Sequence, residues 1–360
     1  MSTMKVCWEL FNAIEIEEDG SVYLCCDHRL RKQAIGNIFK DNFDNIWNGD
    51  FVQKLREEAL KGQYPHCNPK LCTYLANGDD RLFTDKEPNY KPALDYYPKR
   101  IAFPMGKDCN AKCIFCRDEI ISSSKEEVEN FNRLIDEIYI PISKNLEILT
   151  VNDGGDAFGS KFSRDLIAKF VKTYPNLKFK IMTNGICATK EFIQELNLEN
   201  KMFELDISIN TVNPETHYKI FRIKNGFNAI VKNLEYLATL KEKNLIPSFH
   251  LKFVVCNYNW KEMIQFVKFA RKYHANCDFW EVRDYKNNCL ENKIEDMSVH
   301  FETHPDYKKF KKLLSDPIFD SKDTTLSPVL TKIRNEEIER VKNTISYKIK
   351  KFFYNIKKNK

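Results

Sequence analysis

The chain contains 360 residues with a mass of 42.5 kDa, a length that suits one large domain and one small domain. Hydrophobic residues make up 42% and charged residues 30%, and no apolar run approaches the roughly 18 residues of a membrane-spanning helix. The N-terminus lacks the apolar core of a signal peptide, so the sequence predicts a cytoplasmic protein.

The net charge of +6 comes from one end of the chain. Residues 341–360 hold seven lysines and no acidic residue, so removing these charges leaves the other 340 residues at −1. The body of the protein is therefore not expected to bind nucleic acid. In the tail, apolar residues recur at intervals of three and four, which predicts an amphipathic helix that contacts an anionic membrane surface or packs on the body.

The first 75 residues have the pattern of a separate small unit. Polar and apolar residues alternate around Asp19-Gly20, which indicates a β-hairpin. A segment near helical spacing follows, with apolar residues at Phe43, Ile46, Trp47, Val52 and Leu55. Residues 76–98 are rich in Asn, Asp and Pro, a composition typical of a linker.

Strand and helix patterns alternate from Arg100 onward. Between the strands lie amphipathic segments, one of which opens with Ser124 and Glu127 placed as a capping box. Apolar runs typical of strands occur at 100–104, 146–151, 178–183, 204–209, 249–255 and 278–283. Six such units predict a parallel sheet over residues 99–320, open or curled into a partial barrel, with its chemistry at the carboxyl ends of the strands. Residues 321–360 form the predicted tail.

Twelve cysteines in a reducing compartment indicate metal binding or redox chemistry more than disulfides. Three of them, Cys109, Cys113 and Cys116, directly follow the first predicted strand. Such dense thiolates bind zinc or an iron–sulfur cluster. A closed zinc site needs four ligands, and this segment supplies three. A [4Fe–4S] cluster held by three cysteines instead leaves one iron open to a substrate or cofactor.

The segment CNAKCIFC at 109–116 has an aromatic residue, Phe115, directly before its last cysteine. This segment resembles the signature of the radical S-adenosylmethionine (SAM) superfamily. The resemblance covers roughly residues 99–285 and implies an α/β fold, a partial (β/α)6 radical SAM barrel. It also implies that the three cysteines hold the SAM-binding [4Fe–4S] cluster.

Other segments match the superfamily in chain order. Gly154-Gly155-Asp156 resembles the Gly-Gly-Glu segment whose backbone holds the SAM amino group, with Asp in place of Glu. Met-Thr-Asn-Gly ends the third strand, and residues 206–222 resemble the fourth-strand segment that lies near the SAM ribose and carboxylate. The resemblance thus implies these SAM contacts: Phe115, Gly154, Gly155, Asp156, Asn184, Ser208, Asn210 and Arg222.

The mechanism that the resemblance implies rests on the chemistry of the bound cofactors. SAM chelates the open iron, a reduced cluster donates one electron, and the C–S bond breaks. The products are methionine and a 5′-deoxyadenosyl radical, which takes a hydrogen atom from an unactivated C–H bond. An electron donor such as flavodoxin or ferredoxin is an expected partner.

The remaining cysteines suggest further sites. The set at 7, 25, 26, 67 and 72, around the predicted hairpin and helix, resembles the SPASM/twitch auxiliary-cluster module, which usually follows the barrel and here precedes it as a small α+β domain. This resemblance implies one auxiliary [4Fe–4S] cluster, with Cys26 as a substitute for Cys25 and a structural zinc site as the alternative. The implied ligands are Cys7, Cys25, Cys67 and Cys72. Cys187 and Cys256, just past strands three and five, are candidate catalytic residues or apolar packing residues.

Three functions fit these patterns. The first is a radical SAM oxidoreductase that dehydrogenates a small molecule such as a sugar or cyclitol, because auxiliary clusters are associated with taking an electron from a substrate radical. The second is a radical SAM maturase that modifies a peptide or protein. The third, from another class, is a non-catalytic zinc protein that binds acidic partners through its tail.

Overall fold

The computed structural model describes residues 5–25, 33–69, 72, 74–75, 78, 83–103, 106–151, 154–283 and 294–358, with side chains as far as residue 344. The chain divides into two compact units. The first comprises Met1–Cys109, Ile121–Met182 and Ile193–Phe203, and the second comprises Asn110–Ile120, Thr183–Phe192 and Glu204–Lys360.

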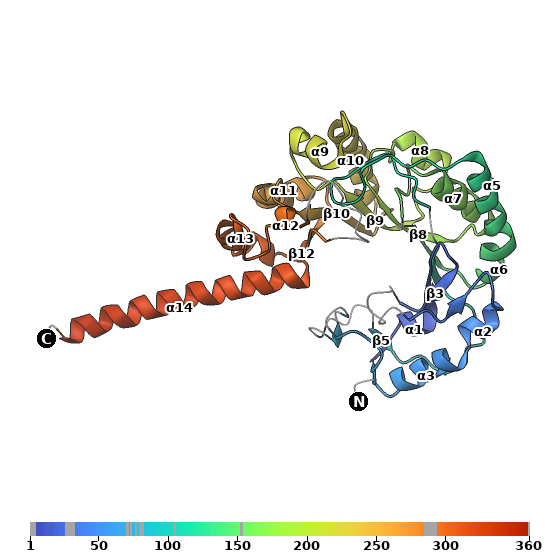
Figure 1. The fold of residues 1–360 in the computed structure, drawn as a ribbon, viewed down its shortest axis with the longest axis horizontal. Helices are drawn as coiled ribbons and strands as arrows, with labels where there is room; N and C mark the ends of the chain where they lie inside the picture. The colour runs from blue at the N-terminus through green and yellow to red at the C-terminus, as the bar shows by residue number, and fades with distance from the viewer. Residues whose placement is uncertain are drawn as a thin grey trace. The chain divides into compact units, whose positions relative to one another are not determined.

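The predicted hairpin is confirmed in the first unit (Figure 1). Gly20 sits at its turn with a φ of +83°, a conformation that disfavours residues with a side chain. The predicted helical segment forms two helices, which separate at Asn48 and Gly49. The elements here are β1 (Lys5–Cys7), α1 (Glu9–Asn12), β2 (Ala13–Ile16), β3 (Ser21–Tyr23), β4 (Gly36–Asn37), α2 (Phe43–Trp47), α3 (Asp50–Ala59) and β5 (Phe83–Asp85), which pairs with β1.

The hairpin belongs to the same sheet as the first predicted strand of the core. β2 pairs in parallel with β6 (Arg100–Ala102), so that Ile14 lies opposite Ile101. β6 pairs in parallel with β7 (Ile148–Val151), and β7 with β8 (Lys178–Thr183). The strand order within this unit is therefore β8-β7-β6-β2-β3-β4.

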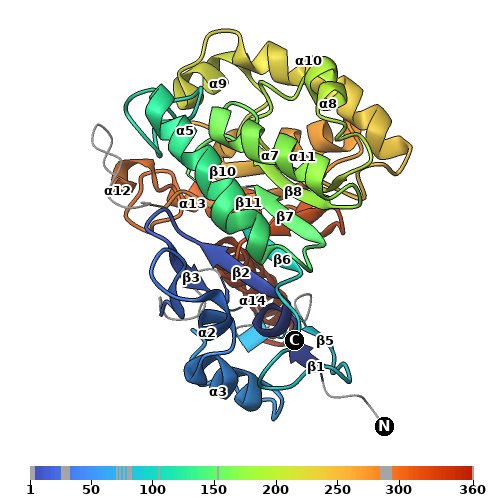
Figure 2. The same ribbon diagram turned by 90° about the vertical axis from the view of Figure 1, so that its right-hand side faces the viewer.

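Helices cover one face of β6 to β8 in the first unit (Figure 2). Ser124 and Glu127 form the predicted capping box, which fixes where α5 begins. Phe103 follows β6 and stacks on Tyr139 with ring centroids 4.2 Å apart, and it also packs against Phe170. The helices are α5 (Lys125–Leu134), η1 (Ile135–Tyr139), α6 (Ile140–Ile142) and α7 (Lys161–Thr173).

The second unit repeats the parallel βα pattern. Its sheet consists of β9 (Met202–Ser208), which enters from the first unit, β10 (Ser248–Val255), β11 (Asn276–Glu281) and β12 (Thr324–Leu326), all parallel. Thus all six predicted core strands are present, and β12 adds to them. The helices are α8 (Lys190–Glu195), which the two units share, α9 (Pro214–Phe221), α10 (Gly226–Glu242), η2 (Trp260–Glu262), α11 (Met263–Lys272), α12 (Ile294–Met297), α13 (Tyr307–Leu314) and η3 (Pro317–Asp320).

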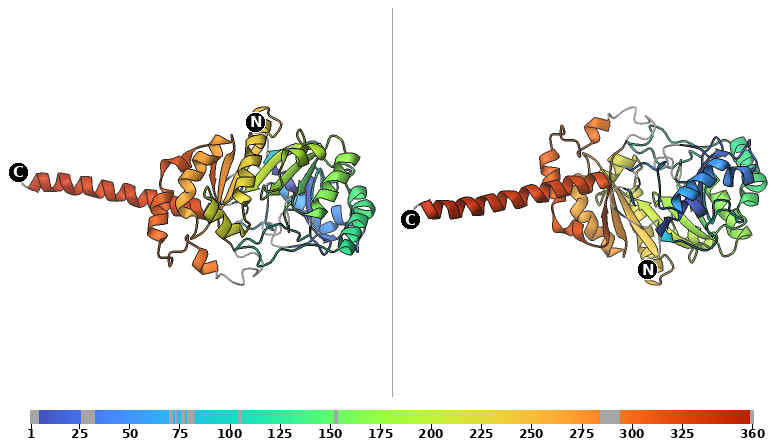
Figure 3. Two further views of the ribbon diagram at one scale, coloured as in Figure 1. Left: turned by 90° about the horizontal axis from the view of Figure 1, so that it is seen from above. Right: turned by 90° about the horizontal axis from the view of Figure 1, so that it is seen from below.

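The predicted tail helix is confirmed as the last part of α14 (Pro328–Lys358). Its first turns are anchored in the second unit by buried Leu330, Ile333 and Glu337, whereas residues 339–344 are all exposed. Figure 3 shows the rest of the helix extending away from α13. Among the described residues, no helix combines the length and the apolar character that crossing a membrane would require.

Candidate functional site

The loop that carries Cys109 is fixed to its neighbours in the first unit. The backbone N–H of Cys109 donates to the Ile121 carbonyl at 3.1 Å. Asp108 is buried; its carboxylate accepts a hydrogen bond from the Ser123 hydroxyl and its carbonyl accepts one from the Asp156 N–H at 3.0 Å. The start of the cysteine loop is therefore held at the carboxyl ends of β6 and β7.

Two glycines make this close approach possible. A Cβ atom on Gly155 would lie 2.0 Å from the carbonyl oxygen of Asp108, and one on Gly154 would lie 2.4 Å from that of Gly106. Both obstacles are backbone atoms, so no side-chain rotation relieves them. Gly154 also has a φ of +74°. Only glycines allow this segment to contact the backbone beside Cys109.

The Asp156 carboxylate accepts hydrogen bonds from the backbone that directly follows it. The donors are the N–H groups of Phe158 at 3.2 Å and Gly159 at 2.7 Å, and the Asp156 side chain is buried. The carboxylate thereby shapes the turn that precedes α7. The short Asp side chain, which stands here where the resembled segment has Glu, thus bonds to N–H groups two and three residues along the chain.

The second half of the cysteine loop lies in the second unit, on the last turn of α9. The N–H of Ile114 donates to the Ile220 carbonyl at 3.0 Å, and that of Lys112 donates to the Phe221 carbonyl at 3.4 Å. A helix end leaves its last carbonyls without intrahelical partners, and the loop supplies donors to two of them. Cys113 and Cys116 are half-buried on a turn in which Cys116 N–H donates to the Cys113 carbonyl at 2.9 Å.

The end of the third core strand also contacts this part of the loop. The Asn184 amide donates to the side-chain oxygen of Asn110 at 2.6 Å, and the Asn110 amide contacts the Cys187 sulfur at 3.4 Å. Asn184 and Cys187 were predicted site residues, and the structure brings both to the cysteine loop. Asn110 was missed, although its position between the first two cysteines was a visible signal.

The end of β9 is organised by Asn210. Its φ is +60°, its side-chain oxygen accepts from the Val254 N–H at 2.7 Å, and Asn259 donates to its carbonyl at 2.8 Å. Ser208, two residues earlier, is half-buried. Arg222 caps α9 in a left-handed conformation with a φ of +58°. The side chain of Asn210, two residues beyond the end of β9, therefore holds the backbone of Val254.

Phe115 and Cys256 lie in different surroundings. Phe115 is half-buried within the cysteine loop. Cys256 is fully buried beyond β10, and burial raises the pKa of its thiol to about 12, so the thiol is neutral near pH 7. Its N–H donates to the Asn259 side chain at 2.8 Å, which ties it to the same loop as Asn210.

The predicted auxiliary ligands occupy the first unit. Burial raises the pKa of the Cys7 thiol, while backbone hydrogen bonds from Leu10 and Glu9 at the start of α1 act in the opposite direction. The Cys67 sulfur is near enough to Cys7 to influence that pKa as well. Cys25 and Cys72 are half-buried. The substitute ligand named above, Cys26, lies outside the described residues.

An aromatic cluster of Tyr64, Tyr74 and Phe83 lies beside Cys7 and Cys67. The Tyr64 hydroxyl accepts from the Cys7 N–H at 3.2 Å, and the Tyr64 carbonyl accepts from the Cys67 N–H at 3.2 Å. Tyr74 stacks on Phe83 with centroids 3.7 Å apart, and Phe83 lies opposite Cys7 in the β1–β5 pair. Tyr64 thus links two of the four predicted ligands.

The donor set suits thiolate-bound iron. None of the ten described cysteines forms a disulfide, and seven of them are the predicted cluster ligands, each half-buried. Cluster iron binds the deprotonated thiolate of cysteine, so these seven residues have the chemistry that the ligands of an iron–sulfur cluster require. In the part of the chain that the structure describes, no three Cys, His, Asp or Glu side chains are gathered tightly enough to form a metal-ligand set.

Comparison with known families matches two domain models to the chain. Residues 103–270 match the radical SAM superfamily, and residues 7–73 match SPASM, described as an iron–sulfur cluster-binding domain. The first model implies a [4Fe–4S] cluster and SAM, and the second implies an auxiliary iron–sulfur cluster.

Two curated relatives resemble part of the chain. One is the FeMo cofactor biosynthesis protein NifB of Methanocaldococcus infernus, which is 20% identical over 48% of this chain and 63% of its own length. The other is the AdoMet-dependent heme synthase of Methanosarcina barkeri, which is 26% identical over 51% of this chain and 50% of its own. The chain therefore matches only about half to two thirds of the length of these relatives.

Solved structures with distant similarity include Streptococcus suis SuiB bound to its precursor peptide SuiA, with 11% identity, 93% and 75% of the two chains covered, and a TM-score of 0.47. A second is anSMEcpe with bound AdoMet, with 20% identity, 63% and 62% coverage, and a TM-score of 0.41. The two domain models, the strand order and the cysteine loop against Gly155 lead to one assignment. The chain belongs to the radical SAM superfamily and carries a SPASM iron–sulfur domain ahead of its radical SAM domain.

Proposed function

We propose that this protein is a radical SAM oxidoreductase that dehydrogenates an alcohol carbon of a small molecule such as a sugar or cyclitol. The observation that carries the proposal is the Cys-x3-Cys-x2-Cys loop held against the Gly154-Gly155 backbone at the ends of parallel strands. In such sheets, ligands bind at the carboxyl ends of the strands. When bound, a reduced [4Fe–4S] cluster and SAM supply a 5′-deoxyadenosyl radical that removes a hydrogen atom from the substrate.

The chain's own residues position these groups. In this proposal Cys109, Cys113 and Cys116 hold the cluster. Within the first unit, backbone hydrogen bonds join Cys109 to Ile121 and Asp108 to Asp156, and within the second unit others join Lys112 and Ile114 to the end of α9. The proposed SAM contacts are the Gly154-Gly155 backbone and a further set comprising Phe115, Asp156, Asn184, Ser208, Asn210 and Arg222.

The thiols of Cys187 and Cys256 differ in how far they are buried. Cys187 is half-buried and contacts Asn110 in the cysteine loop, so we place it beside the reacting atoms. Cys256 is enclosed, so we expect it to support the loop that contains Asn259.

An auxiliary cluster held by Cys7, Cys25, Cys67 and Cys72 is the proposed acceptor of the substrate electron. Replacing these four cysteines by Ala should leave SAM cleavage within about threefold of the wild type but abolish formation of oxidised product, because only the second electron then lacks an acceptor. The measurement is 5′-deoxyadenosine and product yield by mass spectrometry. Cys277→Ala, a buried thiol remote from both cysteine sets in the chain, is the matched control. Full product yield from the four-fold variant would reject the role.

Iron analysis separates the competing readings. About eight irons and matching sulfide per chain are expected from two [4Fe–4S] clusters after anaerobic purification. Zinc in place of iron would favour the non-catalytic interaction protein. Substrate-dependent 5′-deoxyadenosine release by peptides, and by no small molecule, would favour the maturase.

The proposal also includes the domain boundaries and the cellular location of the protein. We assign the auxiliary-cluster domain to residues 1–75, a linker whose β5 pairs back with β1 to 76–98, the radical SAM core to 99–320 and the basic tail to 321–360. Half-buried cysteines that form no disulfide, and oxygen-sensitive clusters, suit the reducing cytoplasm, where flavodoxin or ferredoxin supplies electrons.

The exposed part of α14 is proposed to contact an anionic membrane surface. Residues 339–344 are exposed, including Val341, so the helix is not packed there. Near an anionic leaflet each basic residue contributes about 1 kcal/mol, and residues 341–360 contain seven lysines. Deleting 341–360 should abolish low-salt binding to vesicles containing phosphatidylserine while leaving the melting temperature unchanged. Vesicles of phosphatidylcholine alone are the control. A lowered melting temperature, without vesicle binding by the intact chain, would show a packing role instead.

A further inference from the structure

Arg56 is a fully buried arginine of the first unit, and among the residues that the structure describes it contacts no carboxylate. Its guanidinium carbon lies 4.2 Å from the centre of the Trp47 ring. Nε donates to the Leu10 carbonyl at 2.9 Å, and Nη1 donates at 3.1 Å to both the Asn48 side chain and the Pro92 carbonyl. The remaining nitrogen, Nη2, has no hydrogen-bond partner within the described part of the chain.

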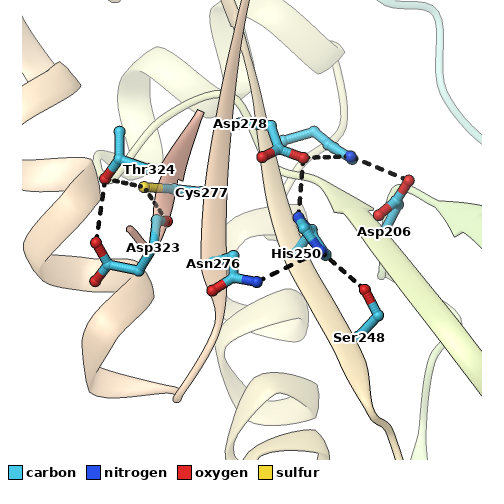
Figure 4. Close-up of polar contacts among 9 residues, drawn as sticks. Asp206, Ser248, His250, Asn276, Cys277, Asp278, Asp323 and Thr324 are labelled. Atoms are coloured by element: carbon cyan, nitrogen blue, oxygen red, sulfur yellow. Dashed lines mark hydrogen bonds and ion pairs between the residues drawn. The ribbon is translucent and has the colours of Figure 1, made fainter. Parts of the chain in front are cut away.

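Two comparable cations of the second unit are paired with acidic side chains. Lys252 contacts Asp206 at 3.2 Å and also contacts Asp278 (Figure 4). Arg334 is buried, and it contacts a carboxylate at 2.8 Å. Moving a charge into the interior costs free energy that a carboxylate partner offsets in part. Arg56 has no such partner, so its charge is costly if the side chain only fills space.

The guanidinium keeps its charge in this position. Burial lowers the pKa of Arg56 to about 9, which leaves the group protonated near pH 7. A neutral side chain of similar length, such as methionine, would fill the same space without the cost of burying a charge. The presence of a charge therefore indicates a nearby group whose negative charge it stabilises.

Cys7, a proposed ligand of the auxiliary cluster, is reached through one residue of α1. Leu10 accepts from Arg56 through its carbonyl, and the N–H groups of Glu9 and Leu10 face the Cys7 sulfur. The first N–H groups of a helix have no intrahelical partner, so they can donate to this sulfur. Summing the bonds and contacts along this path places the guanidinium within roughly 11 Å of the sulfur.

The acidic residue beside Cys7 has its own partner. Glu9 is buried and acts on the Cys7 thiol as a negative charge. Its carboxylate forms an ion pair with Arg100, whose guanidinium lies over the Trp8 ring. These two charges oppose each other. The described residues therefore leave the charge of Arg56 without a counter-charge.

Arg56 also connects the segments that carry two of the proposed ligands. It lies on α3, and the chain that follows α3 leads to Tyr64 and Cys67, whereas Leu10 lies on α1 shortly after Cys7. The Tyr64 hydroxyl accepts from the Cys7 N–H at 3.2 Å, and the Tyr64 carbonyl accepts from the Cys67 N–H at 3.2 Å. The hydrogen bond between Arg56 and Leu10 joins the same two segments in the protein interior.

We propose that Arg56 is a positioning residue for the auxiliary cluster, which joins the α1 and α3 segments and favours the reduced state of that cluster through its positive charge. This inference rests on the proposed function, in which the auxiliary cluster takes one electron from the substrate. Hydrogen bonds to the ligand sulfurs and nearby charges help to set the potential of an iron–sulfur cluster. Reduction adds negative charge, so a buried cation raises the potential and makes the cluster a better electron acceptor.

Arg56→Met tests this role in the iron-loaded full chain, by an anaerobic redox titration followed by electron paramagnetic resonance. The auxiliary signal is the one that SAM leaves unchanged, because SAM binds the other cluster. Over roughly 11 Å at an effective dielectric constant of about 20, removing the charge changes the ratio of oxidised to reduced cluster by up to about tenfold. We expect at least about threefold, which for one electron lowers the midpoint potential by about 30 mV. The potential of the SAM-binding cluster should not change.

Arg56→Lys separates the charge from the fold. It keeps the positive charge and should recover at least half of the shift, whereas a purely structural role would affect both variants alike. Arg334→Met, which removes a buried arginine of the second unit, is the matched control and should leave the auxiliary potential unchanged. If Arg56→Met loses its auxiliary iron, Arg56→Gln, which keeps an N–H donor for Leu10 but no charge, should show the same fall in potential.

Three results would overturn the proposal. The first is a change of less than about 1.5-fold in the ratio of oxidised to reduced auxiliary cluster in a neutral variant that holds its iron. The second is an equal fall in potential at both clusters. The third is loss of the auxiliary iron from all three Arg56 variants, which would leave the residue a structural role alone. Any of these with intact SAM cleavage by the wild type would reject the role of Arg56 only, whereas absent SAM cleavage would reject the proposed function.

Discussion

Replacing Cys109, Cys113 and Cys116 together by Ala is expected to abolish SAM cleavage, with a loss of at least about 1000-fold in 5′-deoxyadenosine formation. The reason is that thiolates are the ligands of the cluster, and Ala offers no donor atom. The same variant should retain about four irons per chain in the SPASM domain. A single preparation of the variant is sufficient: chromatography of the reaction mixture measures 5′-deoxyadenosine, and iron analysis of the protein measures the iron content.

A matched variant separates loss of the cluster from loss of the fold. Cys277→Ala removes one buried thiol that belongs to neither cysteine set, and it should cleave SAM at the wild-type rate. Retained SAM cleavage in the three-fold variant would disprove the assignment of these cysteines. Loss of all iron from that variant would show that the two predicted clusters do not form independently.

Gly155→Ala is expected to reduce SAM cleavage at least about 100-fold, because displacing a reacting group by 1 Å is sufficient for such a loss. The added Cβ would lie 2.0 Å from the Asp108 carbonyl oxygen and 2.9 Å from its carbonyl carbon. The backbone directly before Cys109 must therefore move. Steady-state 5′-deoxyadenosine release and the iron content of the purified variant measure the effect.

The control for this variant is Gly36→Ala in the same unit. Its Cβ would lie 2.8 Å from the buried Ile46 side chain, so the core must repack there, but the nearest atoms to that Cβ belong to Ile46 and Asp41 and not to the cysteine loop. SAM cleavage by the folded variant should therefore stay within about twofold of the wild type. Wild-type activity in Gly155→Ala would show that the contact between the Gly-Gly-Asp segment and the cysteine loop does not position the cluster.

The core strands could be predicted because their apolar runs are local. All six predicted strands are present, and the capping box at Ser124 sets the start of α5 as predicted. The pairing of β2 with β6 could not be predicted in this way, because Ile14 and Ile101 are distant in the chain and no local periodicity records which edges meet. The break at Gly49 was also missed, since Asn48 takes its partners from Leu94 and Arg56.

In the candidate site too, some features could be predicted from the sequence and others could not. The cysteine spacing and the glycines were visible in the sequence, and the structure explains why Gly155 cannot carry a side chain. Asn110 and the Asp206–Lys252–Asp278 network were not recognised, because each depends on which strand ends lie together. The alternation of Ser248, His250 and Lys252 was present in the sequence, but only the register shows that two aspartates face the lysine.

The central claim is that this chain cleaves SAM by radical chemistry at the Cys109 loop. Its most direct test is anaerobic incubation of the iron-loaded full chain with SAM and dithionite, followed by quantification of 5′-deoxyadenosine and methionine. The account predicts equal amounts of the two products, formed only when the reductant is present. Absence of 5′-deoxyadenosine from protein that holds about eight irons per chain would contradict it.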